Sequence, residues 1–241
     1  MKKNLFLLLA IGGLMSFPMT MNAQQRLDIY NVANIKRYEA ANKEVPAKQK
    51  KEKRVVFIGN SITEGWYSAH PDWFKANNYY GRGIGGQTSP QMVLRFHADV
   101  VALQPDVVVI NAGTNDIAEN TGTYHPSFTL SNIKAMAEIA MANNIKVILT
   151  SVLPHDGFKW NPSIKDAVEK VDALNAEIKA YAAEKKIPYV DYNTEMRTEK
   201  GGMKPELSHD GVHPYPDTYL LMEALVKPVI DKQLKKKNKP I

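Results

Sequence analysis

The sequence predicts an α/β fold with a mostly parallel sheet, and three observations lead to this prediction. Short runs such as Val55–Ile58 and Val107–Ile110 are wholly apolar and rich in β-branched residues, which is typical of strands buried on both faces. Longer segments with helical periodicity alternate with these runs along the chain. Glycine and other turn-forming residues follow the first runs, so those strands should end in loops. At 241 residues the chain is long enough for one such domain with its own core.

Five strands are expected, in alternation with helices. The strands are predicted at Arg54–Gly59, at Tyr79–Tyr80 with the glycine cluster that follows, at Val107–Ile110, at Ile145–Leu149 and at Ile187–Val190. The main helices are predicted from Thr88 or Ser89 to Leu103, around Ile133–Ala140 with an end at Asn143-Asn144, from about Ile164 to Lys186, and over Tyr215–Leu234. Pro71 should start a further short helix within the aromatic-rich stretch 66–78. The connections between parallel strands should be right-handed.

Residues 1–23 are predicted to be a secretory signal peptide. Two lysines follow Met1, Leu5–Leu14 is apolar, and Met21-Asn22-Ala23 resembles a cleavage site before Gln24. The apolar run is short for a stable membrane span, so the mature protein should be exported, to the periplasm or outside the cell, without such a span. An uncleaved anchor is the alternative.

The rest of the chain divides at about residue 54. Segment 24–53 is polar, with weak helical periodicity over Tyr30–Asn42 and a charged linker over Val45–Lys53. Residues 54–241 then form the α/β domain. The chain has no cysteine, which excludes a disulfide, a lipidated cysteine and a cysteine-ligated metal.

The charge pattern argues against nucleic-acid binding. The formal net charge is +6, but lysines at the two ends of the chain supply much of the excess. No interior basic stripe alternates with aromatic residues, as it does on many nucleic-acid-binding surfaces. The basic C-terminal tail is expected to be a solvated end. The pattern indicates no particular oligomeric state.

Four polar segments carry the candidate chemistry. Ser61 follows the first strand, Gly85 and Gly86 lie in the glycine cluster after the second, and Gly113–Asp116 follows the third. Asp210–Pro214 lies near the C-terminus. Because the carboxyl ends of parallel strands share one edge of the sheet, these segments should meet there. Together they would supply a nucleophile, a base, an orienting acid and oxyanion donors, which are the parts that acyl transfer needs.

Each segment also has a purely structural interpretation. Ser61 could be only a helix N-cap, Gly86 could only make a tight turn, and Asn115 could only shape its own loop. His155 and Asp156 form an alternative base and acid, although their loop, with Trp160, also suits a pocket wall. The other candidate histidines have no partner in the pattern and are expected at the surface or lining a cavity: His70, His97, His125 and His209.

Taken in order, the four segments resemble the blocks of the SGNH, or GDSL-type, hydrolase family. The matching stretches are Gly59–Ile62, Arg82–Thr88, Gly113–Asp116 and Asp210–Pro214, and the resemblance covers about Arg54–Leu234. It implies a three-layer α/β/α sandwich of flavodoxin type, with residues 54–241 as the hydrolase domain. It also implies catalysis without a metal or cofactor.

The resemblance further implies a role for each site residue. Ser61 would be the nucleophile, His213 the base, and Asp210 the acid that orients the His213 ring. The oxyanion hole would consist of the Ser61 and Gly86 amides and the Asn115 side chain. A glycine at position 86 suits this role, because a backbone donor must approach the substrate closely.

One departure from the family pattern bears on substrate. Asn60 stands where the GDSL name has aspartate, and Ile62 where it has leucine. The overall pattern looks most like the acetylhydrolase-type members, which implies a serine esterase that removes a short acyl group such as acetyl from a small-molecule or carbohydrate ester. With the predicted signal peptide, the enzyme is expected to be secreted. A lysophospholipid or other lipid esterase is the alternative within this class. A non-catalytic glycan-binding module and a phosphate-binding flavodoxin-like protein are alternatives of other classes. No lysine or Walker-type pattern follows Gly86 to support the phosphate-binding alternative.

Overall fold

A five-stranded sheet forms the centre of the computed structural model, which describes residues 27–236. The strand order is β2-β1-β3-β4-β5, and all four strand pairs are parallel. The strands are β1 (Val55–Gly59), β2 (Tyr79–Gly83), β3 (Val107–Ile110), β4 (Lys146–Thr150) and β5 (Tyr189–Val190). The predicted fold class is confirmed, and the strand order is the flavodoxin-like one that the family resemblance implied.

Successive strand residues face opposite sides of the sheet, and each side has its own core. On β1, Val56 and Ile58 belong to one apolar cluster, whereas Val55 and Phe57 belong to the other. All four are buried, as expected for strands covered by helices on both faces. This two-sided burial explains why the strand runs are wholly apolar.

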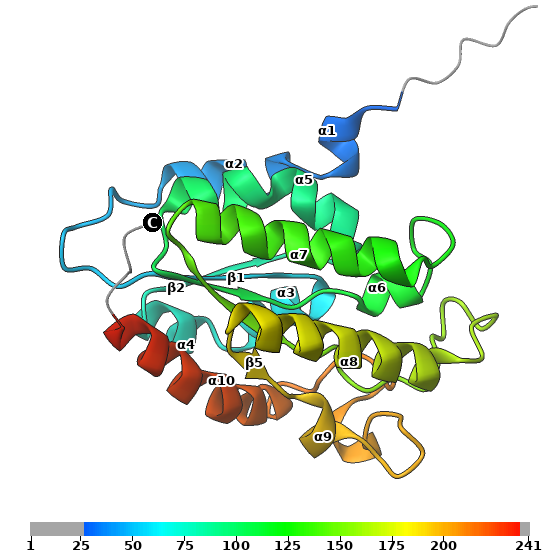
Figure 1. Cartoon of the computed structure of the whole chain (residues 1–241). Helices are drawn as coiled ribbons and strands as arrows, with labels where there is room; N and C mark the ends of the chain where they lie inside the picture. The colour runs from blue at the N-terminus through cyan, green and yellow to red at the C-terminus, as the bar shows by residue number, and fades with distance from the viewer. Residues whose placement is uncertain (1–26, 237–241) are drawn as a thin grey trace, which may run out of the picture.

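Helices cover both faces, which gives the three layers (Figure 1). The first face carries α5 (Ser89–Asp99), α7 (Pro126–Ala142) and α8 (Ala167–Lys185), and the second carries α3 (Ser61–Ala69), α4 (Pro71–Ala76) and α10 (Thr218–Lys235). Shorter elements are the α-helices α6 (Thr114–Ile117) and α9 (Asn193–Met196) and the 3₁₀ helices η1 (Val101–Leu103) and η2 (Pro205–Leu207). In the part of the chain described, no helix combines the length and the apolar character needed to cross a membrane.

The aromatic-rich stretch after β1 packs α3 and α4 onto the sheet. The Phe57 ring lies 5.4 Å from that of Trp66 and 5.2 Å from that of Phe74, both edge-to-face. Pro71 is the first residue of α4, where its fixed φ suits a helix start. These contacts hold the start of α3, and hence Ser61, against the end of β1.

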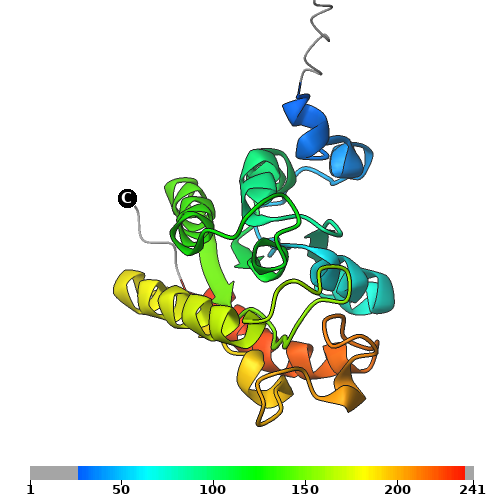
Figure 2. The same ribbon diagram turned by 90° about the vertical axis from the view of Figure 1, so that its right-hand side faces the viewer.

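The N-terminal segment forms α1 (Ile29–Val32) and α2 (Lys36–Lys43), which lie beside α5 in both views (Figures 1 and 2). The Tyr38 hydroxyl donates to the carbonyl of Gly83 at the end of edge strand β2. Asn42 donates to Asp99 at 2.8 Å and accepts from Arg82 at 2.8 Å. This segment is therefore docked on the α/β domain. The predicted signal peptide, residues 1–23, lies outside the described residues.

The structure differs from the predicted elements mainly at helix ends. The short helices α6 and α9 were not predicted, because four residues are too few to show helical periodicity. Helix α7 begins at Pro126, within a predicted loop, since its first turn is largely exposed and lacks an apolar stripe. Helices α8 and α10 each begin three residues later than predicted.

Candidate active site

Ser61 is the first residue of α3, directly after the turn that ends β1. Asn60 caps this helix, because its side-chain Oδ1 accepts a hydrogen bond of 2.9 Å from the Ile62 amide. The interpretation of Ser61 as the helix cap is therefore wrong. The cap is Asn60, and the Ser61 hydroxyl is bonded elsewhere.

A continuous hydrogen-bond chain joins Ser61, His213 and Asp210. Ser61 Oγ lies 2.9 Å from His213 Nε2, and His213 Nδ1 lies 2.6 Å from Asp210 Oδ2. When Nδ1 donates its proton to the carboxylate, Nε2 is left as the acceptor for the serine hydroxyl. This geometry allows the imidazole to take the serine proton.

The loop before α10 holds the Asp210 carboxylate in place. Asp210 Oδ1 accepts from the amides of Val212 at 2.9 Å and His213 at 2.8 Å, and from the Ser208 hydroxyl at 3.1 Å. Burial alone would raise the pKa of Asp210, but the hydrogen bonds from His213 and Val212 outweigh it and hold the pKa far below its usual range. Asp210 is therefore a carboxylate at neutral pH.

The sequence predicts three oxyanion donors, which are the backbone amides of Ser61 and Gly86 and the side-chain amide of Asn115. The Ser61 N–H is at the first helical position and so has no acceptor within α3. Gly86 has a φ of +75°, a conformation that favours glycine, and its carbonyl accepts from Asn120 Nδ2 at 3.1 Å. The Gly85 amide donates to Glu64 Oε2 at 2.8 Å. These bonds fix the glycine loop from both sides.

Asn115 lies on α6, and its side chain is buried. Its Nδ2 donates to the carbonyl of Gln87 at 2.9 Å, which leaves the second N–H of the same amide for another acceptor. The neighbouring Asp116 ties α6 to the start of α5, because its carboxylate accepts from the Ser89 amide and, at 2.6 Å, from the Ser89 hydroxyl. Burial raises the pKa of Asp116, while the hydrogen bonds from Ser89 act in the opposite direction.

The structure does not bring His155 and Asp156 together as a base and its acid. The His155 side chain is fully buried, with Nε2 3.2 Å from the Thr114 hydroxyl and Nδ1 3.4 Å from the Gly211 carbonyl. Asp156 is exposed, and no hydrogen bond joins it to His155 in the described chain. Burial lowers the pKa of His155 to about 4. His155 thus acts as a neutral link between α6 and the Asp210 loop.

Two of the histidines without a predicted partner do have carboxylate neighbours. His70 Nδ1 lies 2.5 Å from Glu223, so it links α3 to α10. The His209 ring stacks at 6.3 Å on that of His213, and its Nε2 lies 3.6 Å from Asp210. His97 and His125 are exposed, as expected.

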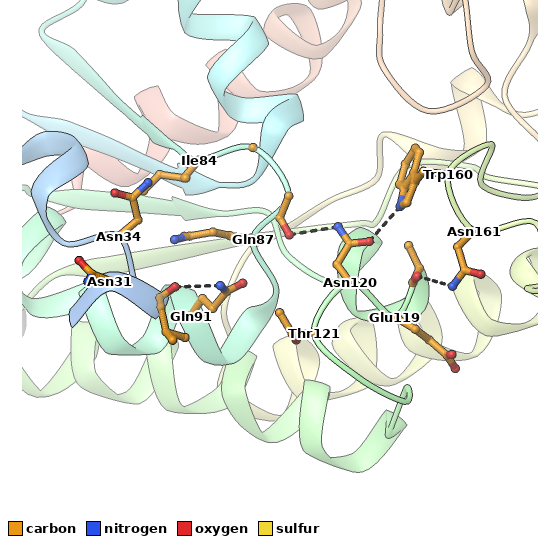
Figure 3. A pocket seen from close by; sticks show the side chains of 14 residues that line it. Asn31, Asn34, Ile84, Gln87, Gln91, Glu119, Asn120, Thr121, Trp160 and Asn161 are labelled. Carbon is orange, nitrogen blue, oxygen red and sulfur yellow. Dashed lines mark hydrogen bonds between the residues drawn. The ribbon is translucent and has the colours of Figure 1, made fainter. Parts of the chain in front are cut away.

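A polar cleft includes Gly85 and Gly86 in its lining and reaches from Asn31 and Asn34 to Trp160 (Figure 3). Its volume is about 610 Å³, within the usual range of small-molecule sites. Neither Ser61 nor His213 lines the cleft, but Trp160, which closes one end of it, has its ring 6.1 Å from that of His213. The cleft therefore adjoins the hydrogen-bonded Ser61 chain rather than containing it.

Several residues that shape the site were missed by the sequence analysis. Arg95 is buried beneath the glycine loop, Glu64 binds the Gly85 amide, and Asn120 binds the Gly86 carbonyl. For Arg95 the sequence did hold a signal, because an arginine lies on the apolar face of a predicted helix. A charge at such a position needs hydrogen-bonding or charged partners. Asn120 lies in a turn with no distinguishing pattern, and only the folded structure reveals its contacts.

Known structures share this fold and, in two cases, much of the sequence. A GDSL-like lipase from Bacteroides thetaiotaomicron is 56% identical, covers 83% of this chain and 98% of its own, and superposes with a TM-score of 0.82. A protein from Bacteroides fragilis is equally similar, with 56% identity, 84% and 98% coverage and a TM-score of 0.83. The acetylxylan esterase Axe2 from Geobacillus stearothermophilus is 17% identical over 80% of this chain and 99% of its own, with a TM-score of 0.60, and shows the fold alone.

Sequence comparison identifies a related enzyme and a matching family. An acetylxylan esterase of Xylanibacter ruminicola is 25% identical over 207 residues, which are 71% of this chain. The match spans 42% of that relative, less than half its length. The family model of the GDSL-like lipases/acylhydrolases matches residues 57–221, more than half of the chain. The predicted family is thus confirmed: the chain belongs to the GDSL-like lipase/acylhydrolase family, a family of carboxylic ester hydrolases.

Proposed function

We propose that this protein is a serine esterase that removes a short acyl group, namely acetyl, from carbohydrate esters through an acyl-enzyme. The observation that carries the proposal is the hydrogen-bond chain from Ser61 Oγ through the His213 ring to the Asp210 carboxylate. In this assignment Ser61 is the nucleophile, His213 the base and Asp210 the acid that orients the imidazole.

The first half-reaction follows from these positions. Ser61 Oγ attacks the ester carbonyl carbon while His213 Nε2 takes the hydroxyl proton. The carbonyl oxygen becomes an oxyanion, for which the proposed donors are the Ser61 and Gly86 amides and the Asn115 side chain. The intermediate then collapses with cleavage of the bond to the alcohol oxygen, which receives the proton from His213. The ionised Asp210 stabilises the transient imidazolium.

The second half-reaction releases the acid. A water molecule attacks the acyl-enzyme and gives a proton to His213 Nε2, the new oxyanion occupies the same donors, and Ser61 leaves with the proton returned. The same three side chains thus serve both steps. The free carboxylic acid is the second product.

Two considerations support the choice of substrate. The curated relative with 25% identity is an acetylxylan esterase, which favours acetyl as the acyl group and a carbohydrate as the alcohol. The cleft beside Gly86 is lined mainly by neutral polar side chains, which suits a sugar better than the chain of a lipid ester.

Kinetic comparison of several esters tests this function. Wild-type protein should hydrolyse 4-nitrophenyl acetate in preference to the octanoate and should release acetate from acetylated xylo-oligosaccharides. Ser61→Ala and His213→Ala should each lower kcat by several orders of magnitude, and the double variant should be little worse than either. Near wild-type activity of Ser61→Ala would contradict the mechanism, and a preference for octanoate would favour a lipid esterase. Failure to hydrolyse any ester would favour a non-catalytic glycan-binding role.

Export is a separate part of the proposal. The lysines, apolar run and small-residue site at the start of the chain support cleavage before Gln24. Mass spectrometry of the protein recovered outside the cytoplasm should give a first residue near Gln24. Recovery of the mature activity with residues 1–23 still attached would contradict cleavage and favour an uncleaved anchor.

A further inference from the structure

We propose, on the basis of the esterase function above, that the polar cleft binds the sugar of the ester, with Trp160 as a stacking platform and the N-terminal segment as the opposite wall. This assigns the alcohol side of the substrate to a defined site. It also gives α1 and the turn after it a part in substrate recognition, although both precede the region matched by the family model.

The chemistry of the lining indicates an uncharged, hydroxyl-rich ligand. Nine of the fourteen lining residues carry side-chain hydrogen-bonding groups, and Glu119 is the one charged residue among them. Among residues 27–236, no lysine, arginine or histidine lines the cleft, so a phosphate group would find no cationic partner in this part of the chain. A long acyl chain would find few aliphatic side chains to pack against, since Val32, Ile84 and Ala118 are the aliphatic residues among the fourteen.

Trp160 is fixed in a position that suits stacking. Its side chain is exposed, at 46% of the residue surface, and its Nε1 donates to Asn120 Oδ1 at 2.9 Å. The Phe158 ring packs 5.2 Å away, which further restrains the indole. A restrained indole with an exposed surface offers an apolar plane to the C–H groups of a sugar ring at little cost in conformational entropy.

The position of Trp160 next to His213 places the cleft on the alcohol side of the reaction. In the proposed mechanism His213 gives its proton to the departing alcohol, which must therefore lie near His213 Nε2. The Trp160 and His213 rings are 6.1 Å apart. A sugar stacked on Trp160 would hold the scissile oxygen near the imidazole while the rest of the sugar extends into the cleft.

Asn120 connects this platform to the glycine loop. Its Oδ1 accepts from Trp160, and its Nδ2 donates to the Gly86 carbonyl at 3.1 Å (Figure 3). The indole and a proposed oxyanion donor are thus held by the same side chain. A ligand on Trp160 would therefore be positioned relative to the Gly86 amide.

The opposite wall comes from Asn31 and Asn34 (Figure 3). Asn34 has a φ of +51° in the turn between α1 and α2, and its side-chain amide has no hydrogen-bond partner among residues 27–236. The wall is anchored by two glutamine side chains, since Gln87 donates to the Ala33 carbonyl and Gln91 to the Val32 carbonyl, both at 2.8 Å. Asn34 is thus held at the cleft with a donor and an acceptor available for hydroxyl groups.

The test compares two substrates in full-length protein. For Trp160→Ala and for the double variant Asn31→Ala/Asn34→Ala, the ratio of kcat/KM for acetylated xylo-oligosaccharides to that for 4-nitrophenyl acetate should fall about tenfold. Trp160→Phe should keep part of the ratio. Phe128→Ala, which removes an exposed aromatic side chain that does not line the cleft, should leave the ratio unchanged. An unchanged ratio in the Trp160 and asparagine variants would overturn the inference while leaving the esterase function intact.

A binding measurement separates this inference from the catalytic proposal. Calorimetry with Ser61→Ala protein and deacetylated xylo-oligosaccharide should detect binding, and adding Trp160→Ala should weaken it about tenfold or abolish it. Binding that is insensitive to Trp160 would contradict the site. Loss of ester hydrolysis in the wild type would instead contradict the esterase function, whatever the binding result.

Discussion

Arg95 Nη2 donates a hydrogen bond of 2.9 Å to the carbonyl of Gly59, the last residue of β1 and two residues before Ser61. The same guanidinium donates through Nη1 to the carbonyl of Arg82 on β2 at 2.9 Å, and through Nε to Gln87 at 2.6 Å. One buried side chain thus joins the ends of two strands and the loop that follows the second. The relative positions of Ser61 and Gly86 depend on this connection.

Replacing Arg95 should therefore destabilise the fold strongly. Arg95 and its partner Asp99 are essentially unexposed and lie 2.9 Å apart, so Arg95→Met would leave a buried carboxylate without its counter-ion. We expect a loss of about 3–5 kcal/mol in the free energy of unfolding, measured by urea denaturation. The double variant Arg95→Met/Asp99→Leu should recover part of this loss, because no buried charge is then unpaired. Equal destabilisation of the single and double variants would contradict this explanation.

The contacts of Arg95 also show why the sequence predicted the strands and helices better than the hydrogen bonds that hold the candidate site in place. The wholly apolar runs of β1 and β3 are typical of strands that are buried on both faces, so a mostly parallel sheet could be predicted. The bonds of Arg95 to carbonyls join residues 13 and 36 positions away. Main-chain carbonyls are the same for every residue type, so no sequence pattern identifies them as partners.

The same distinction applies within the candidate site. Asp210 and His213 are three residues apart, and a single turn brings their side chains together, so their pairing could be anticipated. The helix cap could not be assigned between Asn60 and Ser61, because both residue types cap helices well. The link between Trp160 and Gly86 passes through Asn120, and the three positions are too far apart in sequence for any local rule to relate them.

Changing Asp210 to asparagine should lower kcat far more than the same change at Asp156. Asp210→Asn would remove the charge that stabilises the imidazolium and would alter the hydrogen bond that sets the His213 tautomer, so kcat should fall by about 10⁴, as in other triads. Asp156 is exposed and unbonded to His155, so Asp156→Asn should keep near wild-type kcat. Steady-state kinetics with 4-nitrophenyl acetate makes the comparison. A larger effect at Asp156 would mean that the acid has been assigned to the wrong loop.

The buried imidazole of His155 should make the fold sensitive to mild acid. The unfolded chain binds a proton at the ordinary pKa of 6.5, whereas the folded protein does not until about pH 4, because burial lowers the pKa of His155. Between these values the unfolded state holds more protons, so stability falls as the pH decreases through this window. The contribution of His155 to this loss should reach about 3 kcal/mol.

Comparison with a variant isolates that contribution from other titrating groups. The difference in free energy of unfolding between wild type and His155→Gln should shrink by about 3 kcal/mol from pH 7 to pH 4. His97→Gln, which changes an exposed histidine, should follow the wild-type curve. Parallel curves for wild type and His155→Gln would show that the imidazole is not held neutral in the folded protein.

Asn115 offers the sharpest test of the oxyanion hole, because its side chain has two separable contributions. One amide N–H donates to the Gln87 carbonyl, which is a structural bond. The other is the proposed donor to an oxyanion that exists only in the transition state and the tetrahedral intermediate. Loss of such a donor should lower kcat and leave KM nearly unchanged.

We therefore expect Asn115→Ala to reduce kcat about 10²- to 10³-fold, equivalent to roughly 3–4 kcal/mol. The unpaired Gln87 carbonyl should also cost about 1–3 kcal/mol of stability, so the melting temperature should fall. If Asn115 served only to hold Gln87, the stability loss would appear without the loss of kcat. Measurement of kcat, KM and melting temperature on one preparation distinguishes the two roles. A folded Asn115→Ala protein with kcat within about threefold of wild type would leave the Ser61 and Gly86 amides as the only donors.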